Sequence, residues 1–200
     1  MKYKKKHRKV SIFFIFIVII SLGILYIQNY HPTNDIEEYH SDNLSIRYNF
    51  LTVNPYSRSG ESLNKVKGVV IHYTANPGST AKNNRNYFEN LKDTHITKAS
   101  SHFIIGLEGE IIQCIPLNEI AYASNNRNSD TISIECCHED ATGQFNEKTY
   151  QSLQSLVKSL MDTYHLKKDD IIRHYDVTGK ICPKYFVDHE DAWNEFLNSL

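Results

Sequence analysis

Three side chains in the sequence are of the types that bind a catalytic metal ion: His72, His174 and Cys182. Imidazole nitrogen and thiolate sulfur are preferred zinc donors, and a catalytic zinc site uses three protein ligands and leaves one position open. The chain has ten histidines, however, and a single histidine is more often an ordinary core or surface residue than a ligand. The residue types alone therefore nominate a metal site without establishing it.

Each candidate ligand lies where a predicted element ends or turns. His72 is near the end of residues 68–74, a β-branched run that predicts a buried strand and is followed by breaker residues. His174 and Cys182 lie within residues 173–187, which contain so many turn-forming residues that we expect no regular structure there.

The pattern of residues 65–200 predicts an α/β domain with a mixed central β-sheet flanked by helices. Further strands are expected at residues 101–107 and 110–115, which form a hairpin, and at residues 131–137. Helices are expected at residues 81–91 after a Ser79 or Thr80 cap, at 147–165 after Asn146, and after Asp188, where Trp193, Phe196 and Leu197 would close the core.

The N-terminal part of the chain predicts a membrane anchor. Residues 1–9 are a basic, cytoplasmic segment, and residues 10–27 form an uncharged apolar run long enough to span a bilayer. The positive-inside rule then puts everything after residue 30 on the extracytoplasmic side of the cell membrane. The alternative is a cleaved signal peptide and a secreted domain. Such peptides usually have a shorter apolar region and a small-residue cleavage site, which this sequence lacks.

Residues 28–64 are polar and rich in turn-forming residues, so we interpret them as an extracytoplasmic tether between the anchor and the domain. Within this tether, residues 44–54 alternate enough between apolar and polar side chains that part of the segment can dock on the domain.

Charge and cysteine usage exclude two classes of protein. Residues 31–200 hold 16 of the 22 Lys and Arg and all 23 Asp and Glu, a net charge of −7 that argues against a nucleic-acid partner. Cys114, Cys136 and Cys137 form no C-x-x-C motif, which argues against a redox protein. Adjacent cysteines on a strand face opposite sides, so Cys136 and Cys137 are expected to be packed thiols rather than a disulfide pair. No obligate protein partner is inferred.

Four stretches resemble a known family. They are V-V-I-H-Y-T, S-S-H-F-I-I-G-L-E-G-E, S-D-T-I-S-I-E and R-H-Y-D-V-T-G-K-I-C-P. Together they look like the ordered motifs of the type 2 N-acetylmuramoyl-L-alanine amidases, which include phage amidase lysins and peptidoglycan recognition proteins. The resemblance runs from about residue 66 to the C-terminus. It implies a zinc amidase catalytic domain at residues 65–200 that hydrolyses the amide bond between the lactyl group of N-acetylmuramic acid and L-alanine in peptidoglycan.

The resemblance also implies roles for individual residues. His72, His174 and Cys182 would bind Zn²⁺, Lys180 would stabilise negative charge on the attacked carbonyl, and Glu135 would transfer protons. Some phage members have a tyrosine before the histidine of the second motif, where this chain has Ser101. That departure favours Glu135 as the proton-transfer group.

Further polar residues are candidates for contact with substrate or ligands. Asn126 and Arg127 belong to a polar loop that can hydrogen-bond sugars and stem-peptide carboxylates, although solvated turn residues would look the same. His102 is expected to line the groove or pack against it. Asp176, Tyr73 and Thr74 are candidates for orienting the imidazole rings.

The sequence is compatible with two other functions. One is a non-catalytic peptidoglycan-binding module of the same fold, which would have lost the cysteine ligand. The other is a zinc peptidase that cuts within the stem peptide.

Overall fold

The computed structural model describes residues 38–41 and 44–200. The predicted cytoplasmic segment, the predicted membrane anchor at residues 10–27 and the first part of the predicted tether lie outside the described residues. Among the residues that the structure does describe, no helix has both the length and the apolar character needed to cross a membrane.

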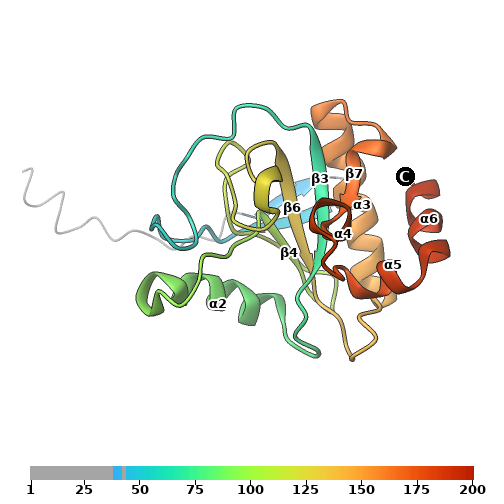
Figure 1. Cartoon of the computed structure of the whole chain (residues 1–200), viewed down its shortest axis with the longest axis horizontal. Helices are drawn as coiled ribbons and strands as arrows, with labels where there is room; N and C mark the ends of the chain where they lie inside the picture. Colours follow the sequence, from blue (N-terminus) through green and yellow to red (C-terminus); the bar gives the residue numbers. More distant parts are fainter. Residues whose placement is uncertain (1–37, 42–43) are drawn as a thin grey trace, which may run out of the picture. The chain divides into compact units, whose positions relative to one another are not determined.

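A mixed seven-stranded sheet forms the centre of the described domain, with strand order β1-β2-β5-β4-β6-β3-β7 (Figure 1). β3 pairs in parallel with both β6 and β7, and β4 pairs in parallel with β6. The β4–β5 pair is antiparallel, which confirms the predicted hairpin. The strands are β1 (Glu38–Ser41), β2 (Leu44–Tyr48), β3 (Gly68–Tyr73), β4 (Phe103–Ile105), β5 (Ile111–Gln113), β6 (Thr131–Cys136) and β7 (Ile171–Arg173).

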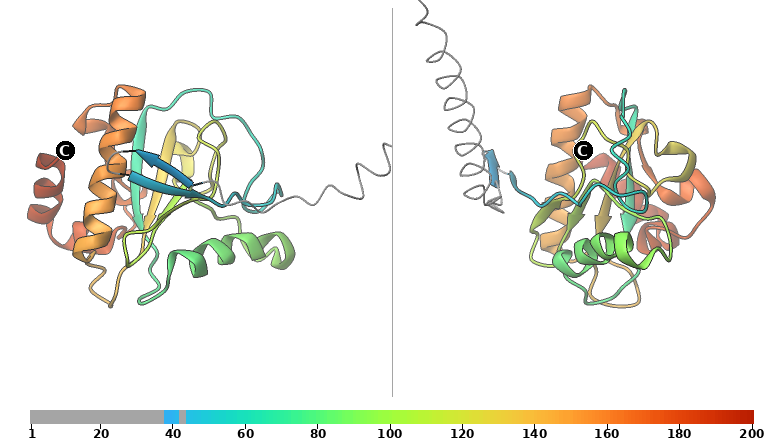
Figure 2. Two further views of the ribbon diagram at one scale, coloured as in Figure 1. Left: turned by 180° about the vertical axis from the view of Figure 1, so that it is seen from behind. Right: turned by 90° about the vertical axis from the view of Figure 1, so that its left-hand side faces the viewer.

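Helices cover both faces of the sheet, as predicted. Figures 1 and 2 show α2 on one side and α3, α5 and α6 on the other. Because side chains alternate along a strand, Phe103 and Ile105 pack toward α3 while Ile104 packs toward α2. The helices are α2 (Ala81–Thr94), α3 (Glu147–Tyr164), α4 (His174–Thr178), α5 (Lys184–Asp188) and α6 (Glu190–Asn198), with 3₁₀ turns η1 (Asn125–Arg127) and η2 (Lys168–Asp170).

Side-chain caps explain why α2 and α3 begin where the sequence predicts. The Thr80 hydroxyl accepts a hydrogen bond from the Asn83 backbone N–H, and the Asn146 side chain accepts one from Thr149. Each bond satisfies a backbone donor that has no partner within its helix. The cysteine prediction is confirmed as well. All four cysteines are free and buried, and Cys136 and Cys137 lie in the cores on opposite faces of the sheet.

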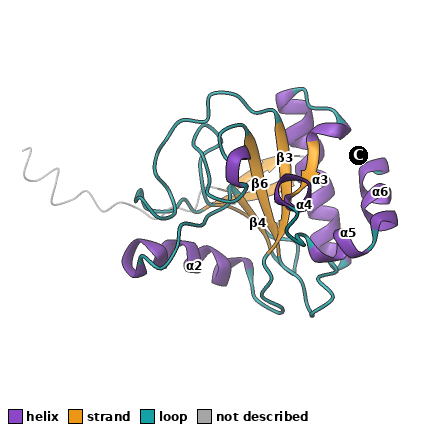
Figure 3. Ribbon diagram, viewed as in Figure 1, coloured by secondary structure: helices purple, strands orange, loops and turns teal. Residues whose placement is uncertain are grey.

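Two expectations about regular structure are wrong. Residues 173–187 contain the short helix α4 and all but the last residue of the short helix α5 (Figure 3). The Asp176 carboxylate accepts a hydrogen bond from the Arg173 backbone N–H at the start of α4, and Gly179 ends that helix with a positive φ of 76°. The last helix begins at Glu190 rather than directly after Asp188, because Asp188 is the last residue of α5.

The structure also places β2 in the central sheet, where it pairs in parallel with β5. The predicted tether of residues 28–64 includes this strand, so the folded part of the chain starts earlier than residue 65. Leu44 and Ile46 of β2 are buried in the core that α3 covers. The expectation that part of residues 44–54 docks on the domain is confirmed, and the docked part does so as a strand of the sheet.

Phe196 offers a test of how α6 closes the core. Its side chain is 0% exposed and its ring centroid lies 5.5 to 5.7 Å from those of Tyr150, Phe186 and Trp193. We expect Phe196→Ala to lower the free energy of unfolding by about 3 to 5 kcal/mol in urea denaturation. The matched variant Leu197→Ala, at a half-buried position on the same helix, should cost ~1 kcal/mol. Equal losses in the two variants would contradict this packing.

Candidate metal centre

The three predicted ligand residues meet at one edge of the sheet. His72 lies near the carboxyl end of β3, and His174 directly follows the neighbouring parallel strand β7. Cys182 lies in the turn between α4 and α5. All three side chains are buried, and one potential ligand atom from each lies within 4.8 Å of those of the other two. The structure therefore contains a possible metal site formed by these residues.

The distances within the trio suit a metal ion. Cys182 Sγ lies 3.8 Å from His72 Nδ1, and the two imidazole centroids are 4.7 Å apart. A tetrahedral zinc ion holds its ligand atoms about 3.3 to 3.8 Å from one another. Within the part of the chain that is described, His174 Nδ1 is buried and has no hydrogen-bond partner. A buried nitrogen without a partner is costly, and a metal ion at this point would satisfy it.

The outer nitrogen of each imidazole contacts the same loop. His72 Nε2 lies 3.2 Å from Ser124 Oγ, and His174 Nε2 lies 3.1 Å from Asn125 Oδ1. The residues predicted for this role were Asp176, Tyr73 and Thr74. Asp176 instead pairs with the Arg173 guanidinium, and the buried Thr74 hydroxyl has no partner among the described residues. Tyr73 contributes through its backbone N–H, which bonds to the Cys182 sulfur.

Burial favours the uncharged forms of all three candidate ligands. Burial and then the charges of His174 and Lys180 hold the pKa of His72 well below its usual range, and burial followed by the Lys180 charge lowers the pKa of His174. Burial, with a smaller contribution from Glu135, raises the pKa of the Cys182 thiol to about 12. Neutral imidazoles are ready to coordinate a metal, whereas the thiol has to lose its proton as the cation binds.

Glu135 and Lys180 face the same groove as the trio. Glu135 in β6 is the register partner of His72 in β3, so the two side chains lie on the same face of the sheet. Burial raises the pKa of Glu135 to about 8, against the opposing effect of the Lys180 charge. The groove has a volume of about 370 Å³. Its lining also includes Tyr73, Phe88, Lys98, Ala99, Ser100, Tyr122, Ala123, Asn125 and Asn128.

Three predicted substrate-contact residues are not brought to this groove. The side chain of His102 is 1% exposed; its Nδ1 accepts the Ser133 backbone N–H at 3.0 Å and its Nε2 lies 2.9 Å from the Glu119 carbonyl oxygen. Arg127 pairs with Asp130 at 2.7 Å. Asn126 is exposed on η1 and is not part of the lining.

Several residues that line the groove were not predicted from the sequence. Lys98, Ser100 and Tyr122 line the groove, and the Lys98 ammonium lies 5.6 Å from the centre of the Tyr122 ring. The only local signal was their position in polar segments beside predicted strands, which many solvated residues share.

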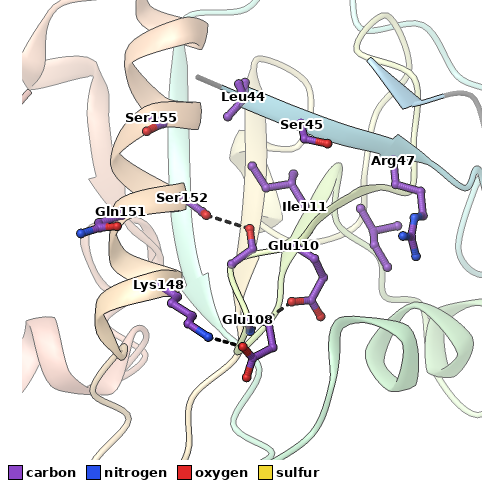
Figure 4. A pocket seen from close by; sticks show the side chains of 12 residues that line it. Leu44, Ser45, Arg47, Glu108, Glu110, Ile111, Lys148, Gln151, Ser152 and Ser155 are labelled. Atoms are coloured by element: carbon purple, nitrogen blue, oxygen red, sulfur yellow. Dashed lines mark hydrogen bonds and ion pairs between the residues drawn. The ribbon is translucent and has the colours of Figure 1, made fainter. Parts of the chain in front are cut away.

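A second hollow, of about 470 Å³, lies between β2, the turn joining β4 to β5, and α3 (Figure 4). Two of its charged residues, Lys148 and Glu108, pair with each other, and the Ser152 hydroxyl donates to the Gly109 carbonyl. No histidine or cysteine is among the described residues that line it. The candidate metal ligands thus line the groove and not this hollow.

Comparison with known proteins identifies the family of the chain. A family model described as N-acetylmuramoyl-L-alanine amidase matches residues 62–185. The chain belongs to this amidase family. It is 39% identical over 165 residues to N-acetylmuramoyl-L-alanine amidase CwlL of Bacillus licheniformis, and the match covers 76% of this chain and 45% of CwlL. It is 35% identical over 172 residues to N-acetylmuramoyl-L-alanine amidase BlyA of Bacillus subtilis strain 168, with the same two coverages.

The chain thus spans about half the length of the curated relatives it matches. Solved structures agree with the family assignment. The catalytic domain of XlyA superposes with a TM-score of 0.65 at 29% identity, covering 77% of this chain and 97% of that one. A mutant endolysin from Bacillus subtilis gives the same TM-score and identity, with coverages of 78% and 98%. The mixed α/β fold is therefore that of the family.

The raised pKa of Glu135 predicts a pH-dependent stability. The folded protein holds this proton up to about pH 8, whereas the unfolded chain releases it near 4.5. The free energy of unfolding should therefore fall as pH rises through that window. A pKa difference of one between the folded and unfolded states changes the free energy of unfolding by about 1.4 kcal/mol. Because Glu135 is partly exposed, the change should be smaller than this conversion gives.

The test is urea denaturation of the metal-free wild type and Glu135→Gln in excess chelator, at about pH 5 and about pH 8. From the lower to the higher pH, the free energy of unfolding of the wild type should fall by ~2 kcal/mol more than that of Glu135→Gln. Comparing the two proteins cancels the histidine titrations that they share. A stability difference that does not change with pH would refute the assignment.

Proposed function

We propose that this chain is a zinc-dependent N-acetylmuramoyl-L-alanine amidase that hydrolyses the amide bond between the lactyl group of N-acetylmuramic acid and L-alanine in peptidoglycan. The observation that carries the proposal is the meeting of His72, His174 and Cys182 in a groove that Glu135 and Lys180 also line. Relatives that are themselves named as amidases of this type support the choice of reaction.

In this proposal His72, His174 and Cys182 hold Zn²⁺. The donor set of two imidazoles and one thiolate is of the zinc type, and the partnerless Nδ1 of His174 supports coordination at that nitrogen. When bound, zinc lowers the pKa of water to about 7 and polarises a carbonyl group. The backbone N–H of Tyr73 helps to stabilise negative charge on the Cys182 sulfur.

Glu135 is the proposed general base and acid. Its Oε2 is buried without a hydrogen-bond partner in the described part of the chain, and its pKa of about 8 is near working pH, where proton transfer is most effective. Glu135 takes a proton from the attacking water. As the carbon–nitrogen bond breaks, it delivers that proton to the nitrogen of the departing L-alanine. The products are a lactyl carboxylate and a peptide with a free amino group.

Lys180 is the proposed stabiliser of charge on the attacked carbonyl oxygen. It lies two residues before Cys182 and lines the groove, and its positive charge lowers the pKa of both histidines. Because the Lys180 charge is close enough to disfavour a second positive charge on the histidines, it is also close enough to stabilise negative charge on a carbonyl oxygen bound in the same groove.

The same residues distinguish the enzyme from a binding module of the same fold. A module that only holds peptidoglycan has no need for a thiolate at the third ligand position. Cys182 is retained and buried beside both histidines. We therefore favour catalysis, with peptidoglycan as the partner and no role for nucleic acid.

We further propose that residues 10–27 anchor the chain in the cell membrane, with residues 28–37 as a spacer and the domain on the extracytoplasmic side. The uncharged apolar run and the six Lys and Arg residues that precede it support this arrangement. Confinement beside the wall would raise the local concentration of substrate without a dedicated binding repeat.

The reaction is tested by digesting purified sacculi with the full chain and analysing the products by mass spectrometry. Lys180→Ala should lose about 100- to 1000-fold in rate, because one donor to the oxyanion is removed. Lys158→Ala, at an exposed position on α3, should retain wild-type rate. Products cut within the stem peptide would indicate a peptidase, and near wild-type turnover by Lys180→Ala would remove that residue from the mechanism.

Metal dependence is tested in the same assay. Treatment with a strong chelator followed by dialysis should abolish cleavage of the lactyl–L-alanine amide bond, and one equivalent of Zn²⁺ should restore the cleavage. Cys182→Ala should stay inactive after zinc is added. Full activity in the chelated wild type would contradict the zinc mechanism.

The anchor is tested by expressing the full chain and a chain that starts at residue 31. After an alkaline carbonate wash, the full chain should remain in the membrane fraction while the shorter chain is released, because a spanning helix is not extracted with peripheral proteins. Recovery of a shortened chain from the medium would instead indicate a cleaved signal peptide.

A further inference from the structure

We infer that a single loop, residues 122–128, selects the tautomer of both histidine ligands and so sets the affinity of the site for metal. Ser124 and Asn125 are the positioning residues. The inference rests on the proposed function, because it concerns how that zinc site is prepared to receive its ion.

The two rings present the same nitrogen to the metal position. His72 Nδ1 faces the Cys182 sulfur at 3.8 Å, and His174 Nδ1 is buried with no partner in the described residues. A neutral imidazole carries one N–H, so coordination through Nδ1 requires the proton on Nε2. A ring with its proton on Nδ1 would direct that proton at the metal and could not bind it.

The loop meets both Nε2 atoms. Asn125 Oδ1 lies 3.1 Å from His174 Nε2, and a carbonyl oxygen can only accept, so this contact favours the Nε2–H tautomer. Ser124 Oγ lies 3.2 Å from His72 Nε2, and the buried hydroxyl can accept in the same way. Partners of this kind fix ring orientation and strengthen the other nitrogen as a ligand.

The loop is itself held in place, so it can act as a rigid template. Asn128 Oδ1 accepts the backbone N–H groups of Ala123 at 3.1 Å and Ser124 at 2.6 Å. At the other end, the Thr131 hydroxyl donates to the Arg127 carbonyl at 2.6 Å. η1, which follows Ser124, contacts α4, the helix that begins with His174.

Asn125 has a special backbone conformation as well as a side-chain contact with the His174 imidazole. Its φ is +52°, a left-handed conformation that asparagine, aspartate and glycine adopt more readily than other residues. Asn125→Gly therefore removes the acceptor and preserves the backbone conformation. Asn125→Asp keeps an oxygen acceptor at the same place and should act as the rescue variant.

The first experiment measures the tautomers directly in the metal-free full chain at about pH 8, by two-dimensional ¹H–¹⁵N NMR of the histidine rings. In the wild type, both His72 and His174 should carry the proton on Nε2. Asn125→Gly should lose this preference at His174 and keep it at His72, whereas Ser124→Ala should do the reverse. A role limited to folding would not move one ring without the other.

The second experiment measures zinc affinity by competition with a chromophoric chelator. Asn125→Gly and Ser124→Ala should each bind zinc about 10- to 100-fold more weakly than the wild type, and Asn125→Asp should recover most of the loss. Asn126→Gly is the matched control, because Asn126 is an exposed neighbour on the same 3₁₀ turn. It should bind as tightly as the wild type.

The outcomes separate this inference from the proposed function. Wild-type zinc affinity in Asn125→Gly and Ser124→Ala, or a His174 ring with its proton on Nδ1 in the wild type, would overturn the role of the loop and leave the amidase proposal standing. A wild-type chain that binds no zinc would overturn the amidase proposal and this inference together. A loss in Asn126→Gly as large as in Asn125→Gly would mean that the loop acts only through its general stability.

Discussion

The parallel pairing of β3 with both β6 and β7 is the constraint on which the site depends. Parallel neighbours bring their carboxyl ends to one edge of a sheet, which is where ligands bind in folds of this kind. His72, Glu135 and His174 come from these three strands or from the residue that follows one of them. A slip of one residue in either pairing would turn side chains to the opposite face and separate the groups. The apolar cores on both faces of the sheet therefore position the chemistry as well as stabilise the fold.

Burial creates the electrostatic situation that a divalent cation resolves. The same loss of solvent lowers the pKa of His72 and His174 and raises that of Cys182 and Glu135. Without a cation the edge of the sheet favours neutral groups, and with one it can hold a thiolate close to a carboxylate. Charged groups that are buried here without a partner would destabilise the folded protein, and a bound metal ion would remove that cost. Metal binding and folding stability are therefore coupled. Two of the four buried side-chain atoms that lack a partner in the described residues, Glu135 Oε2 and His174 Nδ1, belong to residues that line the groove.

Local physical signals explain what could be predicted from the sequence. β3 is a continuous apolar run, and α2 and α3 have an apolar stripe and a capping side chain, so each could be identified within its own segment. Long-range contacts explain much of the rest, since β2 becomes a strand by pairing with β5. The signals for α4 are local, because Asp176 and Gly179 cap its ends, but the many breaker residues around them hid the helix. Ser124 and Asn125 contact rings 52 and 49 residues away in the chain, and no spacing or composition signals such a contact. The family resemblance supplied the pairing of the histidines with Cys182, which residue types alone could only nominate.

X-ray absorption at the zinc edge of the reconstituted full chain identifies the atoms that bind the ion. If two imidazoles and the Cys182 thiolate share a single zinc ion, the spectrum should show two nitrogen neighbours at about 2.0 to 2.1 Å, one sulfur at about 2.3 Å and one further light atom, and Cys182→Ser should lack the sulfur shell. A wild-type spectrum that contains only nitrogen and oxygen neighbours, or one that Cys182→Ser leaves unchanged, would rule out this shared site.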